Sequence, residues 1–207
     1  MPFEVTVEDL INPPSLKPSS TFTDIRIISA FNFEIATFED PTLLIQTQWL
    51  AEVEEFKLTQ SEIGAGKESL YTIELKPGSR LPHTTAFKIT APKEIEIARA
   101  SYDDCYVETQ RVVKGRCSYE GTDILKIDRG LAYFRGGYYY GDVKIVFKAI
   151  NPRSNLNQNV NLKLDISLDN SYKWTIASID GGLAPSFECN YPCLSCSAND
   201  PDDCESC

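Results

Sequence analysis

Hydrophobic and polar residues alternate along much of the chain, in short runs separated by prolines and glycines. Near the start Phe3, Val5 and Val7 alternate, the proline-containing segment 12–20 interrupts the pattern, and alternation resumes over 22–35. From residue 68 onward such runs follow one another at intervals of roughly ten residues, with no helical pattern between them. Period-two alternation predicts strands, and closely spaced strands without intervening helices predict an all-β sandwich.

The later predicted strands lie in ESLYTIELK, TTAFKITA, EIEIARA, CYVETQRVV, GTDILKID, GDVKIVFKAI, NVNLKLDISL and SYKWTIASI. One segment, 42–56, is ambiguous. Leu50, Val53 and Phe56 have roughly helical spacing, yet Phe56 and Leu58 continue an alternating pattern. A short helix and a strand both remain open there.

Two pentapeptides, INPPS at 11–15 and INPRS at 150–154, suggest an internal repeat. The same offset of 139 positions aligns five further apolar pairs, which are Val7 with Val146, Ile25 with Leu164, Ile27 with Ile166, Phe33 with Tyr172, and Ile35 with Trp174. The alternating residues before the two pentapeptides are one position out of phase, which a β-bulge would correct. If the repeat is real, Pro13 and Pro152 lie in the same turn of two copies.

The sequence therefore predicts tandem Ig-like β-sandwich repeats followed by a small disulfide-rich module. Residues 1–40 are expected to be the C-terminal strands of a preceding repeat, 41–180 a complete sandwich, and 181–207 the start of a cysteine-rich module. Because the chain begins within an alternating pattern, we expect it to be an excerpt of a longer protein.

Composition narrows the function classes. The formal net charge of −10 argues against nucleic-acid binding, which needs clustered Lys and Arg. No apolar run approaches the roughly 20 residues of a membrane-spanning helix. MPFEVTVEDL lacks the basic and apolar regions of a signal peptide. The chain has no N-x-S/T sequence, so N-glycosylation is not expected.

Seven cysteines predict an oxidising compartment, and all are expected in disulfides: Cys105, Cys117, Cys189, Cys193, Cys196, Cys204 and Cys207. Two alternatives remain. Four tail cysteines form two C-x-x-C pairs that would suit zinc, although their seven-residue gap is short. Lys114 and Arg116 beside Cys117 would lower the pKa of a free thiol and make it reactive.

The tail, PCLSCS…CESC, resembles furin-like, growth-factor-receptor-type cysteine-rich repeats. Together with the I-N-P-x-S segments, it is similar to large surface proteins of ciliated protists that combine such repeats with Ig-like units. Ile63-Gly64 before SLYTIEL fits a second element of those units, and Cys105 and Cys117 occupy places where they carry a paired cysteine. The resemblance implies an extracellular, modular and adhesive or structural protein.

Little in the sequence indicates catalysis. His83 is the only histidine and lies in a turn-rich segment, so most acid–base triads lack their base. Glu94 and Glu96 alternate with isoleucines, as on a solvated sheet face. For the acidic residues, calcium binding is favoured over catalysis by a pair of carboxylates. The candidate calcium ligands are Asp103, Asp104, Asp180, Asp200, Asp202 and Asp203, but no spacing matches a defined calcium loop. We expect no enzyme activity, no catalytic residues and no resident cofactor.

The stretch LAYFRGGYYYGD (131–142) is the best candidate binding surface, through Tyr133, Arg135, Tyr138, Tyr139 and Tyr140. The simpler interpretation is a hairpin with alternate tyrosines in the core. The favoured function is an extracellular structural or adhesive repeat unit of a stalk, coat or filament. Its partners would be neighbouring repeats or copies of itself, other surface proteins or glycans. A receptor ectodomain and a calcium-dependent binding module are the alternatives.

Overall fold

The computed structural model describes residues 14–15, 17–18, 25–38, 50–99, 104–110, 112–113, 115–131, 137–152, 161–180, 193, 195–197 and 200–206. These residues form strands, turns and loops and contain no helix, so no described helix could cross a membrane. The predicted all-β class is confirmed. At the ambiguous segment a strand begins at Val53, so the helix is wrong from there on; residues 42–49 lie outside the description.

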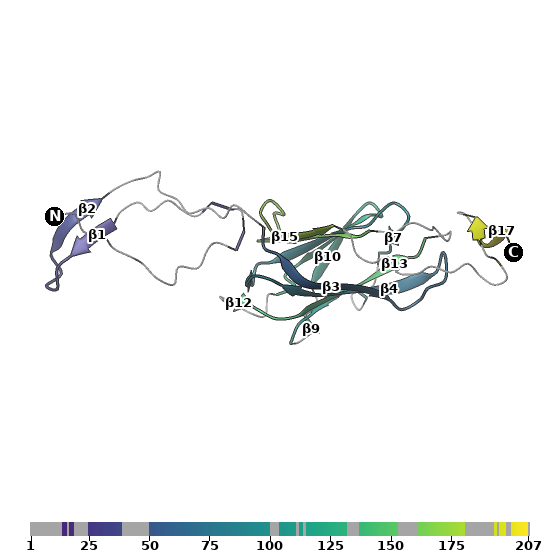
Figure 1. Cartoon of the computed structure of the whole chain (residues 1–207), viewed down its shortest axis with the longest axis horizontal. Coiled ribbons are helices and arrows are strands. Elements are labelled where there is room, and N and C mark those ends of the chain that lie inside the picture. Colours follow the sequence, from purple (N-terminus) through teal and green to yellow (C-terminus); the bar gives the residue numbers. More distant parts are fainter. Residues whose placement is uncertain are drawn as a thin grey trace.

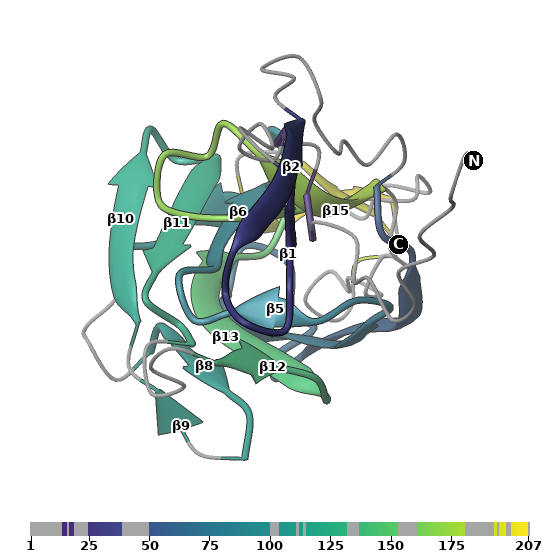
Figure 2. The same ribbon diagram turned by 90° about the vertical axis from the view of Figure 1, so that its left-hand side faces the viewer.

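Two antiparallel sheets form the main body, and Figure 2 shows them as two layers. The first sheet has the order β3 (Val53–Gln60), β4 (Glu68–Pro77), β13 (Val143–Ile150), β8 (Tyr106–Glu108) and β9 (Val112–Val113), with β7 (Glu96–Ile97) also paired to β13. The second has the order β10 (Arg116–Glu120), β11 (Ile124–Asp128), β6 (Ala86–Thr90), β14 (Lys163–Ser167) and β15 (Thr175–Asp180). The result is a β-sandwich.

Three further pairs of strands lie outside the two large sheets. They are β5 (Leu81–Pro82) with β12 (Tyr138–Tyr139), β1 (Ile25–Ile28) with β2 (Glu34–Phe38), and β16 (Ser195–Ser197) with β17 (Asp200–Ser206). In Figure 1 the β1–β2 and β16–β17 hairpins are drawn in purple and yellow near the two chain ends. Among the described strands, β1 and β2 are paired only with one another.

The core between the sheets follows from the alternation along each strand. On β4 every second residue is buried, including Tyr71 and Ile73, and on β13 Phe147 stacks on Tyr71 with ring centroids 5.6 Å apart. The facing sheet contributes fully buried side chains from its central strands, which are Phe87, Ile89, Leu125, Ile127, Leu164 and Ile166. Burying each such side chain contributes roughly 1.5–3 kcal/mol.

Of the predicted strands, one is shortened in the structure and another is divided. In EIEIARA only Glu96–Ile97 is a strand, because the Ile95 N–H donates to the Pro92 carbonyl and closes a turn before it. CYVETQRVV folds into β8 and β9, which pair antiparallel with Val107 opposite Val113.

Asn151 of INPRS ties together three segments at the end of β13. Its side chain is 1% exposed; Oδ1 accepts from the Tyr71 hydroxyl at 2.7 Å, while Nδ2 donates to the carbonyls of Glu62 and Gly64 at 2.8 and 2.9 Å. The Gly66 N–H donates to the Pro152 carbonyl at 3.0 Å. The Asn-Pro pair therefore does more than end a strand: the asparagine also fixes the loop before β4.

The β1–β2 hairpin tests part of the predicted repeat alignment. Its first strand keeps the offset of 139 against β14, but the second strand corresponds to β15 with an offset of 141, because the β14–β15 turn is two residues longer. Phe33 therefore matches Trp174 rather than Tyr172, and Ile35 matches Ile176 rather than Trp174. The predicted turn at Pro13 lies outside the described residues.

Candidate functional site

The predicted aromatic surface centres on β12, which pairs with β5 at one end of the sandwich. Tyr138 and Tyr140 are 61% and 59% exposed, whereas Tyr139 between them is 5% exposed. The Tyr139 hydroxyl donates to the Asp142 carbonyl at 2.7 Å, and burial, with a smaller contribution from the Asp142 charge, raises the pKa of Tyr139. The structure thus places Tyr139 in the core, as the simpler hairpin interpretation has it, so of these three tyrosines Tyr138 and Tyr140 are the ones at the surface.

An open groove of about 570 Å³ runs beside the exposed tyrosines and is lined by Arg80, Gln110 and Tyr138–Tyr140. Tyrosine rings offer rigid apolar faces with a polar edge, and a guanidinium supplies hydrogen-bond donors. This set suits a ring-shaped or extended polar ligand such as a sugar or a peptide. Tyr133 and Arg135 lie outside the described residues.

Sequence reasoning missed Arg80 and Gln110 because they are far from 131–142 along the chain. Arg80 precedes β5, and the pairing of Tyr138 with Pro82 brings it beside the tyrosines. Gln110 follows β8 in the turn toward β9. The KPGSR turn is the one signal in the sequence that could have suggested a loop there.

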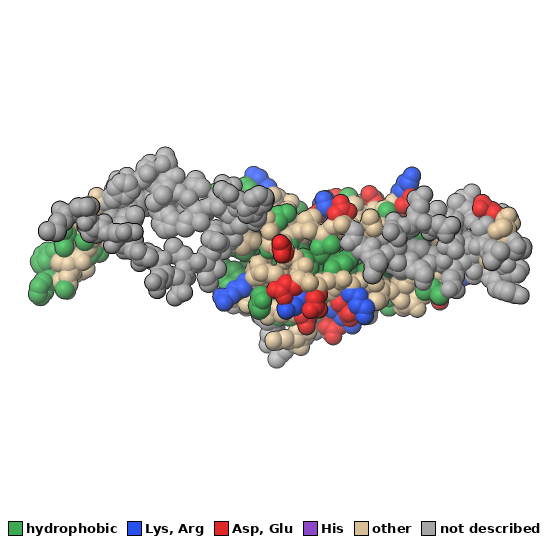
Figure 3. All heavy atoms as spheres, viewed as in Figure 1, with side chains coloured by type: hydrophobic (Ala, Val, Ile, Leu, Met, Phe, Trp, Pro, Cys, Tyr) green, Lys and Arg blue, Asp and Glu red, His purple; other side chains and the backbone are tan. Residues whose placement is uncertain are grey.

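A charged face covers the outside of the first sheet over β3, β4, β13 and β8. Its cross-strand ion pairs are Lys57–Glu74, Lys76–Glu54, Lys144–Glu108 and Lys148–Glu68, with nitrogen–oxygen distances from 2.6 to 4.0 Å. In Figure 3 acidic and basic side chains lie interspersed on the visible face of the sandwich. Exposed pairs of this kind contribute little stability, about 0–1 kcal/mol each. They keep the face soluble and match cross-strand neighbours of opposite charge.

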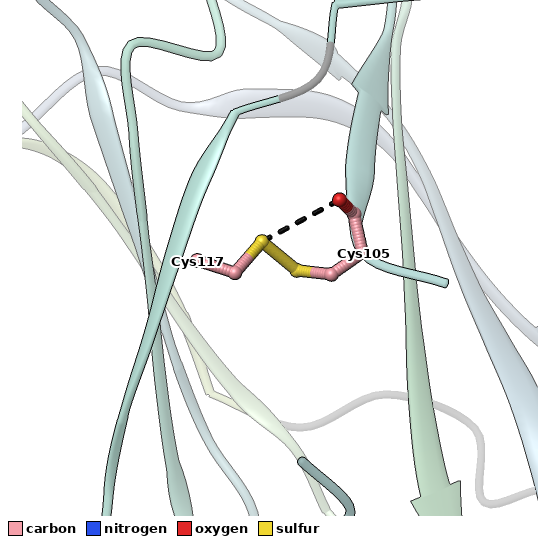
Figure 4. Close-up of a disulfide and its surroundings, with 2 residues drawn as sticks. All are labelled: Cys105 and Cys117. Atoms are coloured by element: carbon pink, nitrogen blue, oxygen red, sulfur yellow. Dashed lines mark hydrogen bonds between the residues drawn. A yellow bond between two sulfur atoms is a disulfide. The ribbon is translucent and has the colours of Figure 1, made fainter. Parts of the chain in front are cut away.

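The disulfide between Cys105 and Cys117 joins the two sheets. Cys105 immediately precedes β8 of the first sheet, and Cys117 lies on β10 of the second, with their Cα atoms 6.5 Å apart (Figure 4). The Cys117 sulfur lies 3.5 Å from the Cys105 carbonyl oxygen. Since both sulfurs are bonded to each other, the alternative of a reactive Cys117 thiol is wrong.

In the tail a second disulfide joins Cys193 to Cys204, beside the β16–β17 hairpin. These are two of the four cysteines that the zinc alternative requires as thiolates, so the described tail does not fit a four-cysteine zinc site. Cys189 and Cys207 lie outside the described residues. Cys196 is on β16, opposite Cys204 in the strand register.

The remaining candidate polar residues do not assemble into a site within the described part of the chain. His83 is half-buried in the turn after β5, Glu94 is half-buried and Glu96 is exposed. No group of three histidine, cysteine, aspartate or glutamate side chains gathers there to hold a metal ion. Of the calcium candidates, Asp104 and Asp180 lie near opposite sheets, three aspartates lie on β17, and Asp103 is outside the description.

No family model and no curated protein matches the chain. Among solved structures, it is similar to the N-terminal domain of the Streptococcus gordonii adhesin Sgo0707, with 12% identity, a TM-score of 0.44, and coverage of 65% of this chain and 32% of that one. It is also similar to the pilus backbone RrgB of Streptococcus pneumoniae, with 16% identity, a TM-score of 0.37, and coverage of 54% and 45%.

The major pilin subunit BcpA of Bacillus cereus is a third structure of this kind, with 8% identity, a TM-score of 0.41, and coverage of 80% of this chain and 48% of that one. The chain thus spans less than half the length of each of these proteins. At these TM-scores the likeness does not indicate what this chain binds.

Proposed function

We propose that this chain is a non-enzymatic structural or adhesive module of an extracellular surface protein. The observation that carries the proposal is the disulfide between Cys105 and Cys117, which fastens one sheet to the other, together with the second disulfide in the tail. Such bonds persist in oxidising compartments and are rare in the cytosol. A cross-linked sandwich suits a module that must keep its shape outside the cell.

Tandem organisation is part of the proposal. The I-N-P-x-S segments and the two matched hairpins support a second copy of the sandwich, and the cysteine-rich tail supports a different module after it. This arrangement is similar to that of the protist surface proteins that the sequence resembles. The partners would be neighbouring repeats or copies of the same protein.

The chemistry of the described surface supports a non-enzymatic role. Four carboxylates on the exposed sheet face, Glu54, Glu68, Glu74 and Glu108, are paired with lysines. The chain's single histidine, His83, is half-buried in the turn after β5. General acid–base or nucleophilic catalysis needs a base positioned against a nucleophile or a reacting proton.

Two measurements test the proposal: the location of the protein in the cells that make it, and the oxidation state of its cysteines. An antibody against the chain should label intact cells as strongly as permeabilised ones. A peptide map without reductant should recover Cys105 linked to Cys117. Labelling only after permeabilisation, or a free Cys117 thiol, would contradict the proposal.

A second candidate function, ligand binding by a receptor-type ectodomain, is favoured by the groove beside Tyr138 and Tyr140. Binding to glycan and peptide arrays should fall at least tenfold in a variant with Tyr138→Ser and Tyr140→Ser, because stacking on an exposed ring is lost. Ile63→Ser removes an exposed apolar side chain from a different loop and is the matched control. Equal binding by both variants would exclude the groove.

A further inference from the structure

The β1–β2 hairpin repeats the register of β14–β15, the last hairpin of the sandwich. In β1–β2 the pairing is regular up to Ile27 and shifts between Ile27 and Ile28. In β14–β15 it shifts between Ile166 and Ser167, the positions 139 residues later. An irregularity at the same place in both ladders indicates one shared hairpin geometry, since bulges are specific features of a fold.

The two turns are also closed alike. The Ser29 N–H donates to the Phe33 carbonyl at 2.8 Å, and the Leu168 N–H donates to the Trp174 carbonyl at 2.8 Å. Each turn also contains a residue with positive φ, Asn32 at 64°, two residues before β2, and Tyr172 at 56°, three residues before β15. The second turn accommodates its two additional residues without changing the hydrogen bond that closes it.

The two hairpins differ in what covers them. Ile176 on β15 is fully buried, whereas Ile35, its counterpart on β2, is 67% exposed. Ser167 is 1% exposed, and its counterpart Ile28 is 54% exposed; Phe33 is 73% exposed. The β1–β2 hairpin thus presents Ile28, Phe33 and Ile35 to solvent, while Ile27 is half-buried. Exposed apolar side chains gathered on one element usually mark an interaction site.

The sandwich itself shows which partner fits. Strand β14 pairs with β6, with Leu164 opposite Ile89 and Ile166 opposite Phe87. On the complete sandwich this edge of β6 is already occupied by β14, so a β1–β2 hairpin cannot pair there without displacing it. The partner therefore has a strand like β6 and lacks its own final hairpin.

We propose that β1–β2 is the closing hairpin of a second sandwich of the same kind, with β1 paired to the strand that corresponds to β6. Ile25 then lies opposite the counterpart of Ile89, and Ile27 opposite the counterpart of Phe87. Ile35 enters that sandwich's core as Ile176 does here. The inference rests on the tandem organisation within the proposed function and specifies the contact that joins this chain to the preceding copy.

The experiment supplies the missing partner within one chain. Residues 50–149 are fused in front of Ile11 of residues 11–207, because Ile11 takes the place of Ile150 at the offset of 139. Amide hydrogen exchange is followed in the peptides covering 25–38 and 163–180, each of which occurs once in the fused chain. Exchange over 25–38 should slow by on the order of 100-fold relative to the original chain, as expected when exposed strands join a cooperative core.

Two matched substitutions assign this protection to the proposed contact. In the fused chain Ile35→Asp should restore fast exchange over 25–38 and leave 163–180 unchanged, while Ile176→Asp should do the reverse. Fast exchange over 25–38 in an unsubstituted fused chain whose residues 163–180 remain protected would overturn the proposal. So would slow exchange over 25–38 in the original chain, or protection there that rises with protein concentration, which would indicate pairing between hairpins of two copies.

A second variant guards against a fusion that fails to fold for other reasons. Residues 163–180 of the original chain are replaced by residues 24–39, which exchanges one hairpin for the other in register. This hairpin-swapped chain should unfold in one cooperative transition. The same chain with Ile35→Asp in the transplanted hairpin should not fold. If the fused chain does not fold at all, failure of the hairpin-swapped chain to fold would refute the inference. Neither hydrogen exchange nor cooperative unfolding depends on surface location or ligand binding. Failure of this inference is therefore distinguishable from failure of the surface-module proposal.

Discussion

Replacing Asn151 by alanine removes three buried or half-buried hydrogen bonds at once. The Tyr71 hydroxyl is left unpaired in a residue with 0% exposure, which costs about 1–3 kcal/mol. The carbonyls of Glu62 and Gly64 are nearer the surface, where water replaces part of what they lose, so we assign them about 1 kcal/mol together. The expected loss of unfolding free energy is about 3 kcal/mol, a large part of the roughly 5–15 kcal/mol that stabilises a domain.

Urea denaturation of the oxidised chain, followed by tryptophan fluorescence, measures this loss directly. In thermal unfolding of the same protein, Asn151→Ala should lower the melting temperature by roughly 6–12 °C. Tyr71→Phe removes one of the three bonds and should cost about 1–1.5 kcal/mol. Because the two residues share a bond, the double variant should lose about 1 kcal/mol less than the sum. Asn161→Ala, at an exposed asparagine, is the control and should change stability by less than about 0.5 kcal/mol. A loss below 1 kcal/mol for Asn151→Ala, or strictly additive single variants, would refute the reasoning.

Three other outcomes follow from the core and the cross-link. Replacing Cys105 and Cys117 by serine should cost about 3 kcal/mol of unfolding free energy, measured by denaturation, and adding reductant to the original chain should have a similar effect. Gly130→Ala should cost about 1–3 kcal/mol in the same assay, since its Cβ would lie 2.7 Å from Val107 Cγ2 and 3.2 Å from Phe87 Cε2. Burial raises the pKa of Tyr71, so the folded state favours the protonated hydroxyl; its stabilisation is complete below about pH 10 and falls above it by about 1.4 kcal/mol per pH unit. Melting curves from pH 8 to 11 should show this decline, and Tyr71→Phe should make it shallower.

Much of the sandwich could be predicted from the sequence, because apolar and polar residues alternate regularly along its central strands. On β4 and β13, Tyr71, Ile73 and Phe147 fall on one face, and no competing pattern covers those segments. The division of CYVETQRVV into β8 and β9 could not be predicted, because both strands are rich in valine and the segment between them lacks glycine and proline.

The candidate groove was only half predictable. Tyr138 and Tyr140 belong to a run of three tyrosines, which identifies the segment as a candidate surface. Because all three residues are identical, their alternation along the strand does not indicate which tyrosine points inward. Arg80 joins them through the pairing of β5 with β12, a contact that sequence spacing does not encode. For the same reason the role of Asn151 could not be inferred, because Tyr71 and Glu62 are 80 and 89 positions away.

The disulfide between the sheets has a mechanical consequence. If the chain is pulled from its two ends until the sandwich opens, the segment between Cys105 and Cys117 stays closed, because the covalent bond carries the tension past it. About 12 residues are then withheld from the stretched polymer, which is roughly 40 Å of contour length at 3.3–3.6 Å per residue. A sandwich in which this bond is oxidised therefore stops extending sooner under load than one in which it is reduced.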